Sequence, residues 1–266
     1  MKIAVAIGDP NGIGPEIAVK AARRFIDSPV QPILVGDEQV LRHYGAEGKL
    51  HPVKSLEPEA FKPGTLDPRA GRATVEYIRA AVGMVRRGEA DAIVACPQSE
   101  TAINKAGIPF SGYAGLLAEL TNTPKERTFL MLVAAVRRLG VANPSLGVFG
   151  INPHAGEDGL FGDEDERITK PAVAELRKRG IDAHGPAGAD LLLSQRRHDV
   201  YLAMFHDQGH IPIKLVSPLR SSALSIGTPV LFSSVGHGCA YDIAGKNVAD
   251  PASVIETLSL LGGTAP

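Results

Sequence analysis

Two histidines occur in sequence contexts that suit metal binding. His154 lies in the motif Asn-Pro-His-Ala-Gly-Glu, and His206 opens the motif His-Asp-Gln-Gly-His. Each follows an apolar run that predicts a buried strand, over residues 146–149 and 200–205, and that then breaks into polar turn residues. Ligands of open α/β sheets bind at the carboxyl ends of strands. Two imidazoles at such ends, each beside an acid or an amide, favour a divalent-metal site over histidines that merely cap turns.

A second candidate site is the turn Gly-Asp-Pro-Asn-Gly-Ile-Gly-Pro-Glu at residues 8–16, between the first predicted strand and the first predicted helix. Its glycines, among them Gly12 and Gly14, let the backbone turn tightly and approach a ligand, and the helix N-terminus offers free N–H groups. The glycine spacing differs from the Rossmann fingerprint. Glycines, prolines and acids, including Glu16, are concentrated in this short turn, which favours a binding loop over an ordinary strand-to-helix connection.

A third candidate is the loop from His237 to Pro251, which begins His-Gly-Cys-Ala-Tyr-Asp-Ile-Ala-Gly-Lys-Asn. A loop with so many small residues can wrap a flat ligand. The carboxylate of Asp242 can accept hydrogen bonds from ribose hydroxyls. On the residues alone, a plain surface loop is the alternative.

The elements that must position these motifs alternate between strands and helices. Such alternation is typical of a mostly parallel sheet with helices on both faces, and so of the α/β class. The Pro- and charge-rich segment 56–68 predicts a surface excursion. The predicted strands are residues 2–7, 32–35, 91–95, 128–133, 146–149, 200–205 and 230–235, and the predicted helices are residues 15–25, 70–87, 167–178, 189–196 and 253–261.

The join between the predicted strands 128–133 and 146–149 is unusually short. Only residues 134–145 connect them, whereas a parallel crossover needs about a dozen residues or more, usually with a helix. The two strands are therefore antiparallel or unpaired, or a structural unit is missing between them.

The composition is that of an ordinary globular protein. Of 266 residues, 44% are hydrophobic and 21% are charged, which suits one large or two modest domains. The net charge of -1 gives no electrostatic case for binding nucleic acid or an anionic membrane. Neither a signal peptide nor a membrane-spanning run is predicted. Cys96 and Cys239 lack metal-type spacing, so we expect reduced thiols and a cytoplasmic protein.

Together, the motifs at residues 8–16, 152–157, 206–214 and 237–245 resemble those of the 4-hydroxythreonine-4-phosphate dehydrogenase family. The resemblance implies the two-domain fold of isocitrate and isopropylmalate dehydrogenases and NAD bound in a site unlike that of Rossmann domains. It also implies a homodimer with the active site in the interdomain cleft, near the partner subunit. The expected domains are an NAD-side domain, residues 1–95 and 220–266, and a metal, substrate and dimerisation domain, residues 96–219.

The resemblance also implies roles for individual residues. His154 and His206 would bind one divalent metal, with zinc the first choice and Mg, Mn or Co the alternatives. Lys214 would contact the substrate and serve in catalysis with Asp190. NAD would be held by the first turn and by the loop from His237 to Asn247, through Gly12, Gly14, Glu16, His237, Asp242, Gly245 and Asn247.

Departures from the family pattern indicate a different substrate. Members that use phosphorylated substrates have an arginine at the position of Phe232, an asparagine at Ala223, a lysine at Glu100 and Gly-His-Thr in place of Gly112-Tyr113-Ala114. Arginine is suited to bidentate phosphate binding, and phenylalanine cannot replace it. A phosphorylated substrate is therefore not expected.

These substitutions resemble the terephthalate cis-dihydrodiol dehydrogenase branch of the family. That branch oxidises 1,2-dihydroxy-3,5-cyclohexadiene-1,4-dicarboxylate to protocatechuate in aromatic catabolism, releasing carbon dioxide and NADH. The resemblance thus implies metal-dependent, NAD-linked oxidative decarboxylation, with the metal as a Lewis acid. Ser111 and Tyr113 are expected to contact a carboxylate of this small-molecule substrate.

One element of the family is absent. A strand with a Val-Thr-x-His sequence and a long helix fill the place of the short join, and that histidine is the third metal ligand. This chain has no such segment between about Val133 and Leu146, and the nearest histidine, His210, follows His206 across a predicted turn. Either a segment is missing from the sequence, or a natural deletion has left an inactive protein, or His154 and His206 hold the metal with an acid such as Asp207 or one from a partner subunit.

Two other functions stay open. A 4-hydroxythreonine-4-phosphate or related phospho-hydroxyacid dehydrogenase would need Arg220 to replace the missing arginine. A non-catalytic NAD-binding remnant would keep the cofactor loop and lack a complete metal site.

Overall fold

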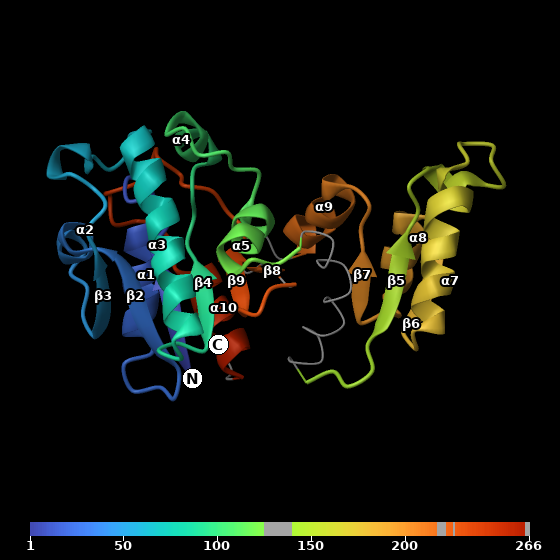
Figure 1. Cartoon of the computed structure of the whole chain (residues 1–266), viewed down its shortest axis with the longest axis horizontal. Coiled ribbons are helices and arrows are strands. Elements are labelled where there is room, and N and C mark those ends of the chain that lie inside the picture. Colours follow the sequence, from blue (N-terminus) through green and yellow to red (C-terminus); the bar gives the residue numbers. More distant parts are fainter. Residues whose placement is uncertain (125–139, 217–221, 226, 264–266) are drawn as a thin grey trace. The chain divides into compact units, whose positions relative to one another are not determined.

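The computed structural model describes residues 1–124, 140–216, 222–225 and 227–263. The chain divides into two compact units. The large unit comprises Met1–Phe129 with Leu219–Pro266, and the small unit comprises Leu130–Pro218 (Figure 1). The predicted strand at 128–133 lies outside the described residues, so the pairing of that strand stays a prediction.

The large unit contains a six-stranded sheet in the order β3-β2-β1-β4-β9-β8. Every neighbouring pair is parallel except β8 and β9, which are antiparallel. The central strands are continuous apolar runs buried on both faces, as expected for a parallel sheet covered by helices. The strands are β1 Lys2–Ala6, β2 Gln31–Asp37, β3 Lys49–Val53, β4 Ala92–Ala95, β8 Ser222–Ser225 and β9 Phe232–Val235.

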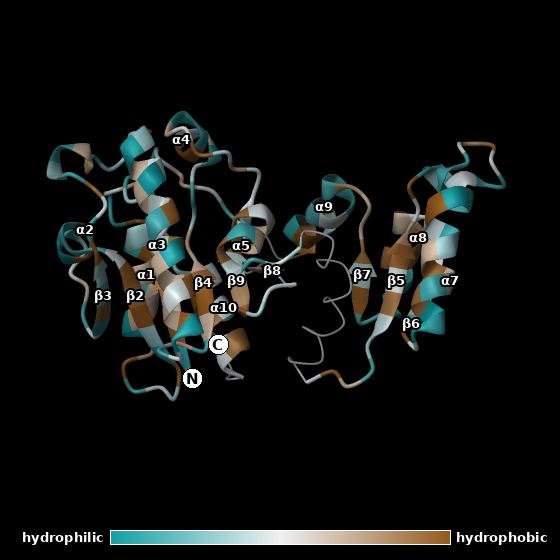
Figure 2. Ribbon diagram, in the orientation of Figure 1, coloured by the Kyte–Doolittle hydropathy of each residue, from teal (hydrophilic) through white to brown (hydrophobic). Residues whose placement is uncertain are grey.

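Helices cover this sheet because each carries an apolar stripe that must be buried. Figure 2 shows the hydrophobic residues concentrated in the strands and the hydrophilic ones on the outer sides of the helices. The longest helix, α3, begins where Asp67 accepts a hydrogen bond from the backbone N–H of Arg69. The helical elements are α1 Gly14–Arg23, α2 Glu38–His43, η1 Pro58–Ala60, α3 Pro68–Arg86, α4 Glu100–Lys105, α5 Tyr113–Thr121 and α10 Ala252–Gly262.

The sequence predicted β1, β2, β4, β9, α1, α3 and α10, gave no prediction for the other elements of this unit, and misjudged two segments. Residues 56–68 are not a simple surface excursion, because Leu56 and Ala60 are buried in the core. Residues 96–124 were expected to begin the second domain but belong to the large unit. The reason is the packing of α4 on α3, which is so close that a Cβ at Gly71 would lie 2.3 Å from the carbonyl carbon of Ala102.

The small unit is a three-stranded parallel sheet in the order β6-β5-β7, with helices packed on it. Its small core includes Leu146, Val148, Val173 and Ala183. The strand predicted at 200–205 is shorter, because the chain leaves the sheet after Leu202 and begins a helix at His206. The elements are β5 Ser145–Phe149, η3 Pro153–Gly156, η4 Asp165–Thr169, α7 Lys170–Lys178, β6 Asp182–Ala187, α8 Ala189–Gln195, β7 Val200–Leu202 and α9 His206–Val216.

Candidate active-site residues

His154 lies just beyond the carboxyl end of β5, in the short turn η3. It has a φ of 54°, and Ala155 after it also has a φ of 54°. Two consecutive non-glycine residues in the left-handed region are uncommon and persist only where the surroundings hold them. The imidazole stacks on the ring of Phe161, with centroids 5.6 Å apart. The backbone therefore presents His154 in a specific, strained geometry.

The buried carboxylate of Asp165 holds this strained turn. Asp165 is fully buried, and its two oxygens accept hydrogen bonds from the backbone N–H groups of Ile151 and Asn152, each at 2.9 Å. The side chain of Asn152 donates to Glu164 at 2.6 Å. The sequence analysis missed Asp165, because an acid eleven residues after the Asn-Pro-His motif gives no local signal of this contact. It is a positioning residue for His154.

His206 begins α9 and follows the neighbouring strand β7. Its Nδ1 lies 2.8 Å from Oδ1 of Asp207. Gln208 connects the two strand ends, because its amide donates to the carbonyl of Gly150 at 3.0 Å while its oxygen accepts from the N–H of Met204 at 2.9 Å. His154 and His206 thus emerge at the same edge of the small sheet.

Asp190 belongs to the same edge, and Lys214 lies farther along the helix that His206 begins. Asp190 is exposed in the first turn of α8, directly after β6, and Lys214 is exposed on α9. Since β5, β6 and β7 are parallel neighbours, the segments that follow them meet at one edge. The small unit therefore brings His154, His206 and Asp190 to the carboxyl ends of its strands, whereas Lys214 lies in the last turn of α9.

The donor atoms at this edge fit a divalent metal in kind, since imidazole nitrogens suit zinc and related ions. The pKa of His210 is lowered by partial burial and by the nearby charges of His206 and Lys214. A lower pKa favours the neutral imidazole that a metal ion requires. Over the described ranges, however, no group of three or more His, Cys, Asp or Glu side chains is placed to hold a metal ion. Asp207, the acid considered as a third ligand, is bonded to His206 instead.

In the large unit, the glycines of the first turn serve the packing of the protein itself. A Cβ at Gly14 would lie 2.2 Å from the carbonyl oxygen of Ile7, and one at Gly12 would lie 2.9 Å from Cβ of Cys239. The N–H of Ile13 donates to the carbonyl of Cys239 at 2.9 Å. The first turn and the loop that starts at His237 are thus packed directly against each other.

Glu16 fastens the same loop farther along. Its carboxylate is buried, pairs with Lys20 at 2.8 Å and accepts the N–H of Ala249 at 2.8 Å. The ammonium of Lys20 also donates to the carbonyls of Asn247 and Ala249, each at 3.0 Å. Glu16, predicted to bind the cofactor, therefore holds the loop in place through contacts inside the protein.

Of the remaining residues predicted to bind the cofactor, some contact other parts of the protein and others are exposed. Nε2 of His237 lies 2.6 Å from the hydroxyl of Ser253. Asp242 and Asn247 are exposed, and Asn247 has a φ of 60°. Gly245 has a φ of 77°, and a Cβ there would lie 2.9 Å from Cβ of Pro63. Asp242 and Asn247 therefore remain available to a ligand.

A buried carboxyl and phenol pair joins the two loops and was not singled out from the sequence. Asp9 is fully buried, accepts the hydroxyl of Tyr241 at 2.7 Å and accepts the N–H of Asn11 at 2.9 Å. Burial raises the pKa of Asp9, and the bonds from Tyr241 and Asn11 oppose that shift. Burial also raises the pKa of Tyr241. The sequence signal that could have identified this pair is the acid inside the Gly-Asp-Pro turn, which is Asp9.

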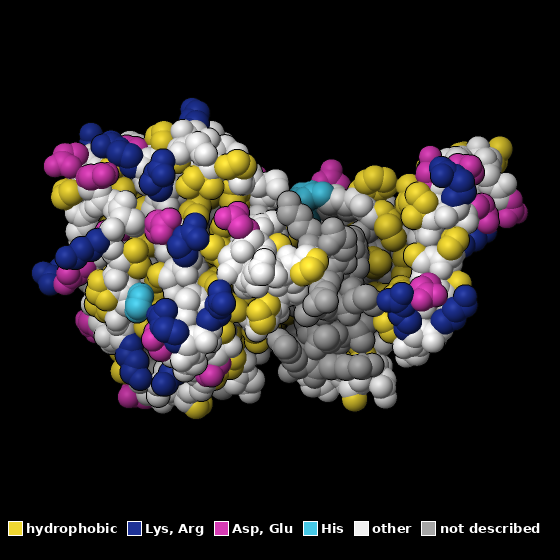
Figure 3. Space-filling model, in the orientation of Figure 1, with side chains coloured by type: hydrophobic (Ala, Val, Ile, Leu, Met, Phe, Trp, Pro, Cys, Tyr) yellow, Lys and Arg dark blue, Asp and Glu magenta, His cyan; other side chains and the backbone are white. Residues whose placement is uncertain are grey.

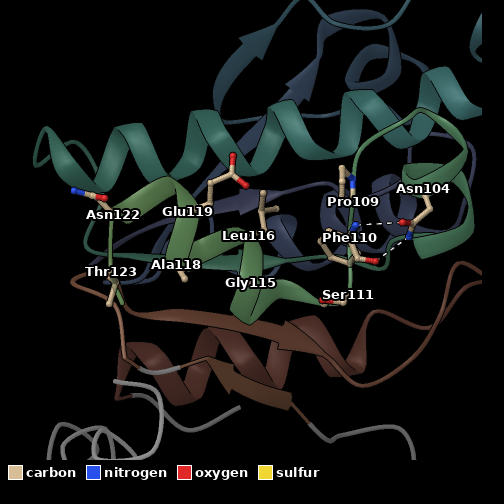
Figure 4. A pocket seen from close by; sticks show the side chains of 11 residues that line it. Asn104, Pro109, Phe110, Ser111, Gly115, Leu116, Ala118, Glu119, Asn122 and Thr123 are labelled. Carbon is tan, nitrogen blue, oxygen red and sulfur yellow. Dashed lines mark hydrogen bonds between the residues drawn. The ribbon is translucent and has the colours of Figure 1, made fainter. Parts of the chain in front are cut away.

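The predicted substrate residues face different surroundings. Ser111 lines a cavity of about 700 Å³ beside α5 (Figure 4). One acid, Glu119, is among its described lining residues and no lysine or arginine is, so this cavity offers no cation to a carboxylate. Tyr113 instead donates its hydroxyl to the carbonyl of Cys96 at 3.3 Å and packs its ring on the fully buried Phe232. Its predicted contact with the substrate stays a prediction.

Comparison with known proteins identifies related sequences over almost the whole chain. The family described as pyridoxal phosphate biosynthetic protein PdxA matches residues 5–137 and 126–261. A 1,2-dihydroxy-3,5-cyclohexadiene-1,4-dicarboxylate dehydrogenase of a Comamonas species is 44% identical, over 98% of this chain and 97% of that protein. That alignment spans 305 positions, more than the 266 residues here, so the relative carries residues that this chain lacks. The family match consists of two segments that overlap at residues 126–137.

Two solved structures are similar to this chain. A terephthalate 1,2-cis-dihydrodiol dehydrogenase from Burkholderia xenovorans LB400 is 42% identical, with a TM-score of 0.69 over 100% of this chain and 99% of that one. A 4-hydroxythreonine-4-phosphate dehydrogenase from Klebsiella pneumoniae is 30% identical, with a TM-score of 0.81 over 99% of this chain and 98% of that one.

Proposed function

This chain belongs to the family of pyridoxal phosphate biosynthetic protein PdxA and is a dehydrogenase, and we propose that it oxidises a cis-dihydrodiol carboxylate with NAD. The substrate would be terephthalate 1,2-cis-dihydrodiol, and the products protocatechuate, carbon dioxide and NADH. The 44% identity to the Comamonas enzyme supports this choice of substrate class.

The observation that carries the proposal is the packing of Phe232. Phosphate-using relatives are expected to have an arginine at this position, and bidentate arginine is a principal phosphate ligand. Here the side chain is fully buried against Tyr113, so the position contributes apolar surface and no charge. An uncharged aromatic pair favours a carbocyclic substrate over a phosphate ester.

The proposed reaction has two steps. The secondary alcohol at C2 gives its hydride to NAD and its proton to a base, which produces a ketone next to the carboxylated carbon. The β-keto acid then loses carbon dioxide, the electron pair of the broken bond forms an enolate, and protonation on oxygen gives the aromatic catechol. Lys214 would hydrogen-bond the reacting oxygen, and Asp190, at the same sheet edge, would hold or move a proton. The hydride chemistry belongs to the cofactor.

The cofactors would lie on different parts of the chain. Exposed Asp242 and Asn247 of the loop held by Glu16 would contact NAD in the large unit. His154 and His206 in the small unit would hold one divalent metal, zinc in the first instance, which as a Lewis acid stabilises negative charge on oxygen. The shared motifs at residues 8–16 and 237–245 support our further proposal that the two units are the domains of an isocitrate dehydrogenase type of fold.

The test is NADH formation by the purified protein with NAD, a divalent metal and terephthalate cis-dihydrodiol. We expect NADH absorbance and protocatechuate to appear in equal amounts and a chelator to stop both. A parallel assay with 4-hydroxythreonine 4-phosphate serves as the control. NADH from the phosphate ester and none from the dihydrodiol would overturn the proposed substrate.

Two alternatives have support of their own. The TM-score of 0.81 to the Klebsiella enzyme favours 4-hydroxythreonine-4-phosphate or a related phospho-hydroxyacid as a second candidate substrate. Arg220, the residue that would bind its phosphate, lies outside the described residues. The segment that this chain lacks relative to the Comamonas enzyme favours a non-catalytic NAD-binding remnant. Tight NAD binding without turnover on either substrate would support the remnant.

We also propose a homodimer in a reducing compartment such as the cytoplasm. Phe205, Ile211, Ile213 and Leu215 expose between 51% and 79% of their surface within one short segment, which monomers rarely do, and a second copy would cover them. Histidine and hydrophobic side chains are visible at the surface around α9 in Figure 3. Cys96 and Cys239 are both free and buried, which suits a reducing compartment. In the ranges that the structure describes, none of the helices is long and apolar enough to span a membrane.

A further inference from the structure

His206 and His210 lie one turn apart on the same helix. The sequence analysis placed a turn between them, and this was wrong: α9 runs without interruption from His206 to Val216. The two imidazole rings are stacked, with centroids 4.0 Å apart and planes inclined by 8°. Both residues are exposed, so the pairing of the rings is not forced by packing in a core.

The spacing and the bonding of this pair suit metal chelation. Histidines four residues apart on a helix are the pair that zinc enzymes with the His-Glu-x-x-His motif use, and the segment here reads His-Asp-Gln-Gly-His. Nδ1 of His206 is occupied by Asp207 at 2.8 Å, which leaves Nε2 as its free nitrogen. A carboxylate on the other nitrogen of a liganding histidine fixes the ring and raises its basicity.

We propose that His206 and His210 chelate one divalent cation together, so that His210 supplies a ligand that the missing segment does not. Both side chains are exposed, so the two imidazoles can rotate out of the stacked arrangement to face one ion. The remaining positions would be open to water, to a substrate oxygen and to His154, which emerges at the same edge of the sheet. This inference rests on the proposed function, because the ion would serve that reaction.

Charges near the pair determine on which side the ion would bind. The carboxylate of Asp207 adds negative charge beside His206. The ammonium of Lys214 lies one turn beyond His210 on the same stripe of α9 and would repel an ion placed toward it. The cation is therefore expected on the His206 side of the pair, away from Lys214.

The test is a titration of the purified full chain with Co²⁺, followed by its visible absorption spectrum and by calorimetry. Changing an outer-shell partner of a metal site costs about 10- to 100-fold in affinity. Loss of a ligand in His210→Gln or in His206→Gln should therefore weaken Co²⁺ binding by at least about tenfold. The matched control is His184→Gln, which changes an exposed histidine of the same unit that also pairs with an aspartate and stacks on a histidine.

The chelate would be supported if Co²⁺ affinity falls equally in His206→Gln and His210→Gln and does not change in His184→Gln. Circular dichroism checks that all three variants are folded. Unchanged binding in His210→Gln would overturn it, as would an unaltered chain that binds no Co²⁺. The dehydrogenase assay separates these failures from failure of the proposed function. NADH formation from the dihydrodiol by an unaltered chain whose Co²⁺ binding does not depend on His210 would overturn the chelate and leave the assigned substrate intact.

Discussion

The ring of Tyr113 packs on the ring of Phe232, with centroids 4.8 Å apart and planes inclined by 54°. Tyr113 begins α5, and Phe232 begins β9, so this contact joins two distant parts of the chain. The hydroxyl of Tyr113 reaches the carbonyl of Cys96 just after β4. Positions 113 and 232, where relatives with phosphorylated substrates are expected to differ from this chain, thus form one aromatic contact.

Phe232→Arg should not create a phosphate site. The introduced guanidinium would be buried where Phe232 is fully buried, and an uncompensated buried charge costs about 3 to 5 kcal/mol of unfolding free energy. Phe232→Leu, the matched control, should cost less than Phe232→Arg, because it loses ring volume and the contact with Tyr113 but buries no charge. Denaturant unfolding measures both. A stable Phe232→Arg protein that oxidises a phosphate ester would contradict the apolar assignment of this position.

Tyr113→Phe tests the predicted carboxylate contact. The present bond to a neutral carbonyl is long, at 3.3 Å, so a substrate carboxylate can compete for the hydroxyl. Since a hydrogen bond to a charged group contributes about 1.5 to 3 kcal/mol, we expect KM for the dihydrodiol to rise roughly tenfold. KM for NAD should not change. Steady-state kinetics with each substrate varied in turn provides the measurement, and an unaltered KM for the dihydrodiol would leave Tyr113 a packing residue.

Glu16→Gln should loosen the loop that ends near Ala249. The variant loses the ion pair with Lys20 and weakens the anchor on the N–H of Ala249, at a cost of about 1 to 3 kcal/mol. Because Glu16 acts through the loop, KM for NAD should rise while kcat with saturating NAD stays near its original value.

The control for this variant is Glu38→Gln, which breaks the exposed pair with Arg42 and should cost under about 0.5 kcal/mol. A fall in kcat with KM for NAD unaltered would argue against a positioning role for Glu16.

Tyr241→Phe should destabilise the protein more at neutral pH than in acid. Burial raises the pKa of Asp9 above its ordinary value of 3.8, so the folded protein favours the protonated carboxyl. The stability that Asp9 contributes is fully present below the unfolded pKa and is lost as the pH rises through the folded pKa. The Tyr241 hydroxyl opposes this loss by donating to the carboxylate at 2.7 Å.

Denaturant unfolding from about pH 4 to about pH 8 measures the effect, and the loss caused by Tyr241→Phe should grow across that range. In an Asp9→Asn background the growth should disappear. An equal loss at both ends of the range would show that the hydroxyl does not act on the ionised form of Asp9.

The sequence alone identified what depends on local pattern. Continuous apolar runs predicted β1, β4 and β5, since short runs of this kind are typical of strands buried on both faces. The turn residues after two of the small-unit strands located His154 and His206 at the ends of those strands. The residue types of the motifs at 8–16 and 237–245 were enough to indicate the family, which the comparisons establish.

The tertiary structure decided which side chains meet, because those contacts join residues far apart in the chain. Glu16 was predicted to face a cofactor, yet it pairs with Ala249 across 233 positions, and Asp9 meets Tyr241 across 232. Segment 96–124 joined the large unit because α4 packs closely on α3 and Tyr113 packs on Phe232, and no local pattern encodes these contacts. The pairing of His206 with His210 depended on a helix that forms in spite of Gly209 and Pro212, and local propensity disfavours such a helix.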